Sequence, residues 1–248
     1  MNVADRILNL IFPPKCFGCG ELLSYYEDSA LCPRCRALFE KEKIALCPDC
    51  EKKHIKCKCR PDILRGYVNT ALHLAEYTKE ESITTNLILS IKERNDKYLY
   101  GFLSDELCKL LEGNVKNLNE YFITFVPRSA DKKRVYGIDQ SEKLSRLISK
   151  KLGIPWIKAF KRKKSKEQKK LTGEERLENA MSSYELKKGA LLDVCNRKII
   201  LVDDVITTAS SVYACSSLLN LNGAAKIVCV TIGKTYKINN SKKATENC

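Results

Sequence analysis

The chain lacks any long hydrophobic run. No stretch of its 248 residues approaches the roughly 18 uninterrupted apolar residues of a membrane-spanning helix. Residues 1–6 also lack the basic region and small-residue cleavage site of a secretory signal. We therefore expect a cytoplasmic protein without a membrane span. The short apolar run 7–12 is expected to form a first helix packed on the module that follows, although a short membrane anchor has the same pattern.

Acidic residues are scarce relative to basic ones. The chain has 30 Asp and Glu against 44 Lys and Arg, which gives a net charge of +14. The densest basic run contains Lys161, Arg162, Lys163 and Lys164, and a shorter one lies at 132–134. Basic runs bind polyanions through counterion release, so DNA is the macromolecular partner they favour. No aromatic residues interleave with the densest run, and a lysine-rich composition can also leave a basic surface without a function.

Cysteine, in contrast, is abundant. Eight of the 13 cysteines lie between positions 16 and 59. Two-residue spacers aim pairs of thiolates at one tetrahedral ion, so the pattern predicts one or two structural zinc sites with no open position for water. The predicted ligands are Cys16, Cys19, Cys32 and Cys35 for one site, and Cys47, Cys50, Cys57 and Cys59 for the other.

Several details of these sites stay open in the sequence. Sequential quartets are the simplest pairing of the cysteines, and a cross-braced pairing is the alternative. His54 could replace a ligand of the second site, but a solvated loop histidine is the plainer interpretation. Disulfides would explain the same cysteines, although the missing secretory signal argues against them.

The length and the 44% apolar content allow one sizeable core and a small satellite module. We expect an N-terminal helix and Cys-rich zinc-binding module at 1–62, an α/β domain at 63–236, and a polar tail at 237–248. Within the domain, strands are expected in 66–77 and at 122–126, 154–160, 199–202 and 224–232, and helices at 79–92, 97–111, 140–152 and 209–221. This alternation predicts a parallel sheet with helices on both faces, and ligands then bind beyond the carboxyl ends of its strands.

The most informative segment connects strand 199–202 to helix 209–221. It begins with the carboxylates of Asp203 and Asp204 and continues into a hydroxyl-rich bend, Thr207, Thr208, Ala209, Ser210 and Ser211. Backbone N–H groups and hydroxyls at such a bend can cradle a phosphate. The two carboxylates suit the vicinal hydroxyls of a sugar, or Mg²⁺. The segment therefore predicts a ribose phosphate site, although an acidic strand end with a simple helix cap is the plainer alternative.

This segment resembles the signature of type I phosphoribosyltransferases. Over nearly the whole chain, the pattern is similar to the ComF family of competence proteins, which join a zinc module to a phosphoribosyltransferase-like domain. Ile91-Lys92, the segment 126–129, the block 136–140 and the spaced residues between 165 and 179 all resemble family elements. The resemblance implies a type I phosphoribosyltransferase-like sheet. It also implies that Asp203 and Asp204 hold the ribose of phosphoribosyl pyrophosphate, with residues 207–211 around its 5-phosphate.

A pyrophosphate with Mg²⁺ requires cations and backbone donors beyond the ribose. Lys92, Arg128 and Ser129 are the candidates, although Lys92 and Arg128 could equally be surface charges. Two departures from the family pattern stand out. Ala209 replaces the usual Gly, which costs energy if the position needs a positive φ, and Tyr136 replaces a basic residue.

Two classes of function remain open at this stage. A DNA-uptake protein would use the pocket for ligand binding and would engage single-stranded DNA or a competence helicase, as the resemblance implies for natural transformation. An active phosphoribosyltransferase would transfer ribose 5-phosphate to an unidentified acceptor, and it would need positioning more than a nucleophile. The sequence offers no dedicated nucleophile, a feature that suits both classes.

Overall fold

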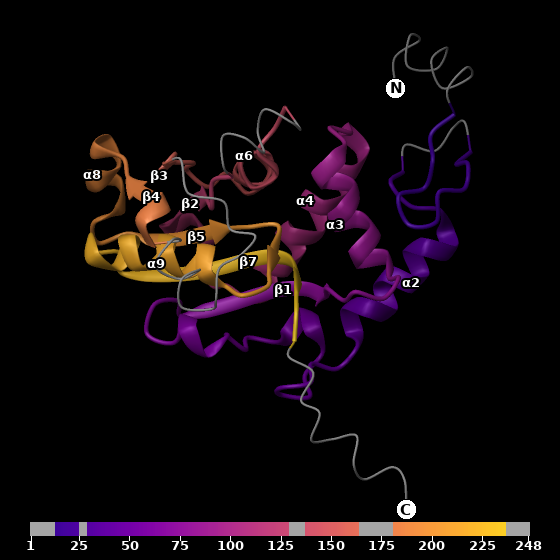
Figure 1. Ribbon diagram of the computed structural model, residues 1–248, viewed down its shortest axis with the longest axis horizontal. Helices are drawn as coiled ribbons and strands as arrows, with labels where there is room; N and C mark the ends of the chain where they lie inside the picture. Colours follow the sequence, from indigo (N-terminus) through magenta and orange to yellow (C-terminus); the bar gives the residue numbers. More distant parts are fainter. Residues whose placement is uncertain (1–12, 25–28, 129–136, 164–180, 237–248) are drawn as a thin grey trace, which may run out of the picture.

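The computed structural model describes residues 13–24, 29–128, 137–163 and 181–236 (Figure 1). At its centre lies a five-stranded parallel sheet in the order β1-β7-β5-β2, with β6 paired to β7. The strands are β1 (Thr70–Glu76), β2 (Tyr121–Phe125), β5 (Lys198–Val202), β6 (Val205–Ile206) and β7 (Lys226–Lys234). The prediction of an α/β fold with a parallel sheet is confirmed.

Helices cover both faces of this sheet. Alternate residues of β5 face opposite cores, as the two-residue period of a strand requires. Ile200 and Val202 pack in the core beneath α3 (Ile83–Glu93), α4 (Lys97–Glu112) and α6 (Gln140–Leu152). Ile199 and Leu201 pack in the core beneath α9 (Ser210–Leu221). The short helix α8 (Leu191–Val194) precedes β5.

Most predicted elements lie within a few residues of their expected bounds. The helix predicted at 140–152 has those bounds, because Asp139 caps its first turn and Gly153 ends it at a φ of 67°. The helix predicted from 79 begins only at Ile83, since the side chain of Ser82 accepts a hydrogen bond from Thr85 N and fixes the start there.

The strand predicted at 154–160 is wrong in its extent. Trp156 forms an isolated bridge to Ile123, supported by hydrogen bonds from Ile123 N to Pro155 O and from Ile157 N to Ile123 O. The chain then turns away into β3 (Phe160–Arg162), which pairs antiparallel with β4 (Tyr184–Leu186). Strand β4 was not predicted, because a three-residue strand carries too little periodic pattern.

The cysteine-rich segment packs directly against the sheet domain. Its helix α2 (Pro33–Ile44) lies beside α3 (Figure 1). The carboxylate of Glu42 on α2 accepts hydrogen bonds from Ile83 N (2.8 Å) and Thr84 N (2.9 Å), so it caps α3. Lys43 on α2 forms an ion pair with Glu106 of α4, and both residues are buried. These contacts fix the module on the domain.

The remaining elements within the described residues are short 3-10 helices at His54–Lys56, Asp62–Leu64, Leu118–Glu120 and Lys188–Ala190. None of the helices in the described part of the chain has the length and hydrophobicity to cross a membrane.

Candidate ligand cleft and metal centres

A cleft of about 250 Å³ opens where the carboxyl ends of β2 and β5 meet. This is the edge at which parallel sheets bind ligands. The predicted site residues Asp203, Asp204, Lys92 and Arg128 line it together with 207–211. The other lining residues are Val126, Pro127, Arg162, Tyr184, Val205 and Val212. The structure therefore brings the two acids, the hydroxyl-rich bend and the predicted cations of the described residues to one place.

The two acids occupy different environments within the cleft. Asp203 accepts a hydrogen bond from Ser141 Oγ (3.0 Å) and another from Asp204 N (2.9 Å). Burial and the neighbouring charge of Asp204 raise the pKa of the Asp203 carboxyl well above its usual value. Asp204 Oδ2 lies 3.5 Å from Arg128 Nη2 and 3.9 Å from Lys92 Nζ. The cations predicted for a pyrophosphate thus flank the second acid.

The beginning of α6 holds these groups in position. Asp139 accepts a hydrogen bond from Arg128 N (2.9 Å) while it caps α6, and Gln140 Nε2 donates to Lys92 O (3.5 Å). Ser141 bonds the carboxylate of Asp203, 62 residues away in the sequence. The positioning roles of Asp139 and Ser141 were not predicted. The sequence signals near them were the block 136–140 and the start of the helix predicted at 140–152.

The hydroxyl-rich bend leads into α9, whose N-terminus faces the cleft with the positive end of its dipole. The hydroxyls of Thr208 and Ser210 lie 3.2 Å apart. Ala209 adopts a left-handed conformation, with φ at 62° and ψ at 2°. A side chain is strained there and glycine is not, so the replacement of glycine by alanine has a steric cost.

The basic run at 161–164 divides between two surfaces. Arg162 lines the cleft, whereas Lys161 and Lys163 both pair with Glu185, at 3.4 Å and 2.8 Å. Lys164 lies outside the described residues, as do Ser129 and the second basic run at 132–134. A DNA-binding role for Lys161, Arg162, Lys163 and Lys164 stays a prediction. Among the described residues of this run, Arg162 faces the cleft, while Lys161 and Lys163 pair with Glu185.

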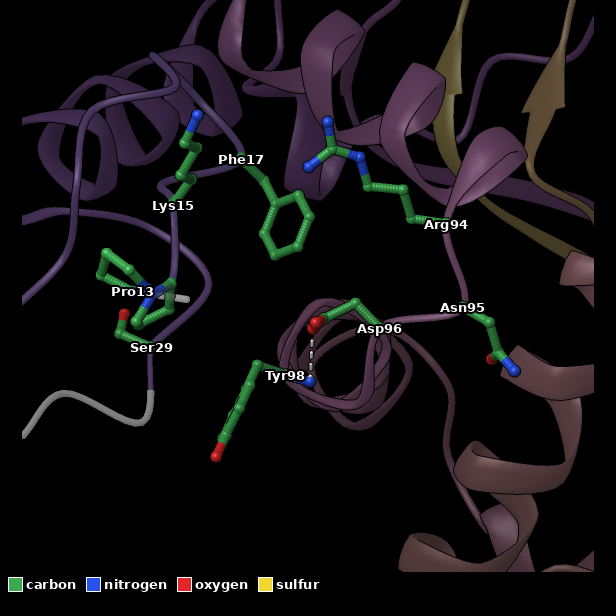
Figure 2. A pocket seen from close by; sticks show the side chains of 9 residues that line it. Pro13, Lys15, Phe17, Ser29, Arg94, Asn95, Asp96 and Tyr98 are labelled. Carbon is green, nitrogen blue, oxygen red and sulfur yellow. Dashed lines mark hydrogen bonds between the residues drawn. The ribbon is translucent and has the colours of Figure 1, made fainter. Parts of the chain in front are cut away.

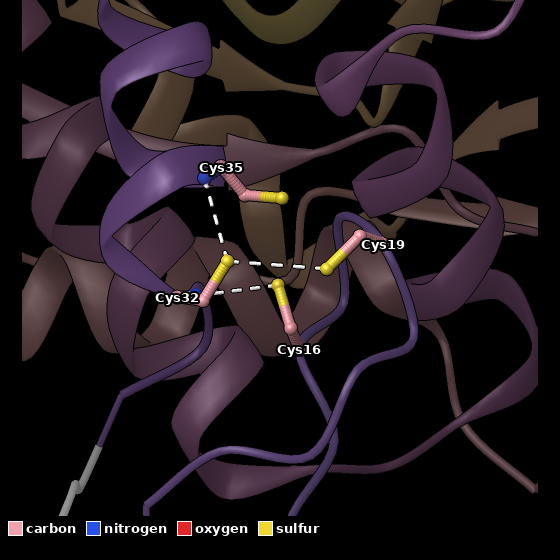
Figure 3. Close-up of side chains that lie close together, drawn as sticks. All are labelled: Cys16, Cys19, Cys32 and Cys35. Carbon is pink, nitrogen blue, oxygen red and sulfur yellow. Dashed lines mark hydrogen bonds between the residues drawn. The ribbon is translucent and has the colours of Figure 1, made fainter.

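The first cysteine quartet brings its four sulfurs together, each within 4.8 Å of the others (Figure 3). Cys19 Sγ and Cys32 Sγ lie 3.9 Å apart. Zn–S bonds of about 2.3 Å in a tetrahedron place sulfurs roughly 3.8 Å apart, whereas a disulfide holds them at about 2 Å. N–H donors from Cys32, Cys19 and Gly18 lower the pKa of Cys16 to about 7 against the raising effect of burial, whereas burial raises the pKa of Cys35. The quartet therefore fits a zinc ion held by thiolates.

The second quartet gathers in the same way, with all four sulfurs within 4.8 Å of one another. The separation is 3.3 Å between the sulfurs of Cys57 and Cys47 and 3.7 Å between those of Cys50 and Cys57. The sequential pairing of the quartets is confirmed, and the cross-braced alternative is wrong. Both quartets are consistent with structural zinc sites.

The interpretation of His54 as a solvated loop histidine is wrong. His54 is buried, and its Nδ1 lies 3.1 Å from Nε2 of the buried His73. Tyr236 Oη lies 2.8 Å from the same atom of His73. His54 therefore packs behind the second quartet, whose four candidate ligands are all cysteines.

A second hollow, of about 410 Å³, lies between the first cysteine loop and the connection from α3 to α4 (Figure 2). Lys15, Phe17, Arg94, Asp96 and Tyr98 line part of it. The guanidinium of Arg94 lies 5.9 Å from the ring centre of Phe17. The carboxylate of Asp96 caps α4 through Tyr98 N (2.8 Å), so it is already engaged. Cations and aromatic rings thus share a surface here.

No protein-family model matches the chain. Among solved structures, adenine phosphoribosyltransferase from Leishmania tarentolae is similar at 13% identity and a TM-score of 0.37, covering 59% of this chain and 74% of that one. The hypoxanthine-guanine phosphoribosyltransferase of L. donovani is 10% identical with a TM-score of 0.30, covering 60% and 71%. An allosteric regulatory enzyme of purine biosynthesis is 14% identical with a TM-score of 0.41, but only 30% of its length is covered, against 60% of this chain.

Among curated proteins, the competence protein ComFC of Streptococcus pneumoniae strain R6 is 25% identical over 229 residues. The match covers 86% of this chain and 96% of that protein, so it includes both the cysteine-rich segment and the sheet domain. Taken with the two cysteine quartets and the α/β domain that carries the acid pair, this similarity identifies the chain as a homologue of ComFC.

Proposed function

We propose that the chain binds phosphoribosyl pyrophosphate with Mg²⁺ in the cleft and acts in DNA uptake during natural transformation. The ligand-binding part of this proposal rests on one observation, that three kinds of chemical group line the same cleft. The acid pair suits a ribose diol, the bend before α9 suits a phosphate, and the cations suit a pyrophosphate. A single ligand with all three chemical features is phosphoribosyl pyrophosphate.

Each part of the ligand has its own candidate contacts. Asp203 and Asp204 would hold the ribose hydroxyls, and residues 207–211 would surround the 5-phosphate. Lys92 and Arg128, with Ser129, would face the pyrophosphate and its Mg²⁺. Lys92 and Arg128 already lie within 4 Å of Asp204, so a bound pyrophosphate would find two cations at the edge of the ribose site.

Binding without efficient turnover is the form of this function that the geometry favours. The left-handed Ala209 places a Cβ in the bend that would approach the 5-phosphate. The intact acid pair argues that ribose recognition is kept. An active phosphoribosyltransferase is the second candidate, and the same acid pair is the observation in its favour.

The DNA part of the proposal rests on the ComFC relative, which is named as a competence protein, and on the net charge of +14. In this proposal the chain works in the cytoplasm on incoming single-stranded DNA, with a competence helicase as a further partner. Phe17 beside Arg94 near the first quartet supports it, because single strands bind to aromatic rings flanked by cations.

A ligand titration tests the proposal directly. Phosphoribosyl pyrophosphate with Mg²⁺ should raise the melting temperature of the zinc-loaded wild type, because a ligand that binds only the folded state stabilises it. Asp203→Asn with Asp204→Asn should abolish this shift, since the carboxylates that accept from the ribose hydroxyls are gone.

A matched control is Asp193→Asn with Asp62→Asn, because both aspartates lie outside the cleft. This control should keep the full thermal shift. A folded wild type that shows no shift would refute the ligand proposal. Pyrophosphate released on adding a candidate acceptor would favour the transferase instead.

A further inference from the structure

Arg162 differs from its neighbours in the basic run because of the strand it occupies. Side chains alternate between opposite sides along a strand. Arg162 belongs to β3, and its neighbours Lys161 and Lys163 both reach Glu185, which follows Tyr184 in β4. The side chain of Arg162 projects the other way, into the cleft.

Two contacts hold the guanidinium of Arg162 in that position. It stacks over the ring of Tyr184 at 5.0 Å from the ring centre, and Nη1 lies 3.4 Å from Pro127 O. Tyr184 is 4% exposed, so it gives the guanidinium a fixed platform. Pro127 belongs to the loop that precedes Arg128. Arg162 therefore links strands β3 and β4 to the loop that contains Pro127 and Arg128.

The charge of Arg162 has no acidic partner among the described residues. Lys92 and Arg128 both lie close to Asp204, which offsets part of their charge. No carboxylate of the described residues forms an ion pair with Arg162, and its Nε is buried without a hydrogen-bond partner. Burying a guanidinium is costly unless an anion balances it. The guanidinium also presents several donors in a planar fork that matches phosphate.

From this geometry we infer that Arg162 is a ligand-binding residue of the cleft that contacts a phosphate group, rather than part of a DNA-binding surface. The inference rests on the proposed function, because it requires a phosphate ligand in this cleft. The phosphate is either the 5-phosphate or the pyrophosphate of the ligand, since Arg162 lines the cleft together with both the bend 207–211 and the loop of Pro127 and Arg128.

Calorimetric titration of the zinc-loaded full chain tests this inference. Arg162→Gln should weaken the binding of phosphoribosyl pyrophosphate with Mg²⁺ at least about tenfold, because a charge-assisted hydrogen bond is lost. Arg162→Lys should weaken it less, since the charge remains and the fork is lost. Lys161→Gln with Lys163→Gln is the matched control and should bind like the wild type. Titration of the variants with ribose 5-phosphate and with pyrophosphate shows which phosphate group Arg162 contacts.

Other outcomes would overturn the inference. If Arg162→Gln binds all three ligands like the wild type, or weakens only the binding of single-stranded DNA, Arg162 does not bind the ligand, but the proposed function survives. Equal weakening by the Lys161 and Lys163 control would reduce its role to general surface charge. A wild type that binds none of the ligands would overturn both proposals. If Arg162→Gln fails to fold, Arg162→Lys gives the answer, because it keeps the positive charge and the long stem.

Discussion

At the scale of single residues, the backbone conformation of Ala209 is the feature of this cleft that calls for explanation. Its φ of 62° lies in the left-handed region, which costs roughly 1–2 kcal/mol for a residue with a Cβ. Ala209 is only 4% exposed, so the surrounding packing holds it in this conformation. The same strain lies at the start of the helix that would face a phosphate. Stability and the proposed ligand binding therefore both depend on this residue.

We predict that Ala209→Gly stabilises the protein by about 1 kcal/mol, because relief of the strain exceeds the added freedom of glycine in the unfolded chain. Urea unfolding of the zinc-loaded protein measures this change. The variant should also bind phosphoribosyl pyrophosphate more tightly, since no Cβ occupies the bend. Ser210→Gly is the control and should destabilise instead, because Ser210 begins α9 and has no positive φ. A destabilised Ala209→Gly would contradict the argument.

At the scale of elements, β7 connects the ligand bend to the second cysteine quartet. Ile206 of β6 pairs with Lys234 of β7. Lys234 Nζ in turn lies 3.1 Å from Asp49 Oδ2 and 3.5 Å from Cys59 O. Thr235 N also donates to Ile206 O at 2.9 Å, just before the bend begins. The loop around the second quartet thus supports the strand that leads into the bend.

This arrangement predicts that loss of the second zinc ion weakens ligand binding. Cys47→Ser with Cys50→Ser should remove one of two zinc ions per chain and lower affinity for phosphoribosyl pyrophosphate severalfold, because Lys234 loses its ordered partners. Elemental analysis and calorimetric titration measure the two effects. Cys16→Ser with Cys19→Ser should remove the other ion with a smaller effect on the ligand. If both double cysteine variants lower the ligand affinity equally, β7 does not couple the second cysteine quartet to the cleft.

At the scale of the whole molecule, the zinc module and the sheet domain form one packed unit. Glu42 caps α3 from the module, and Asn86 of α3 donates to Gly18 O at 2.8 Å. The buried Glu106 keeps a lowered pKa because hydrogen bonds from Lys109 and Lys43 outweigh the raising effect of burial. The basic residues of the described part of the chain therefore belong to one packed body, so several of its surfaces can face a polyanion at once.

Counterion release gives this charge a measurable signature. If Lys161 and Lys163 contact single-stranded DNA, Lys161→Gln with Lys163→Gln should lower the affinity severalfold. The slope of log affinity against log salt should fall by about 1.4, at about 0.7 for each lost phosphate contact. Lys198→Gln with Lys226→Gln is the matched control, because these lysines pair in register at the amino ends of β5 and β7, away from the cleft. An unchanged slope in the first variant would exclude both lysines from the DNA interface.

The sequence by itself determined the features that depend on local spacing. Two-residue spacers define the cysteine quartets, apolar runs define the central strands, and the acids before a hydroxyl-rich bend define one edge of the cleft. Each of these features depends on residues that are close together in the chain. The period of a strand or helix, or the spacing of a cysteine pair, is therefore enough to predict it.

Only the tertiary structure decided how distant residues meet. It turned Arg162 into the cleft, joined Ser141 to Asp203 across 62 residues, and buried His54 against His73. It also placed the second quartet behind the bend through Lys234. These outcomes depend on packing between elements, and no local period encodes which side chains from separate elements come into contact.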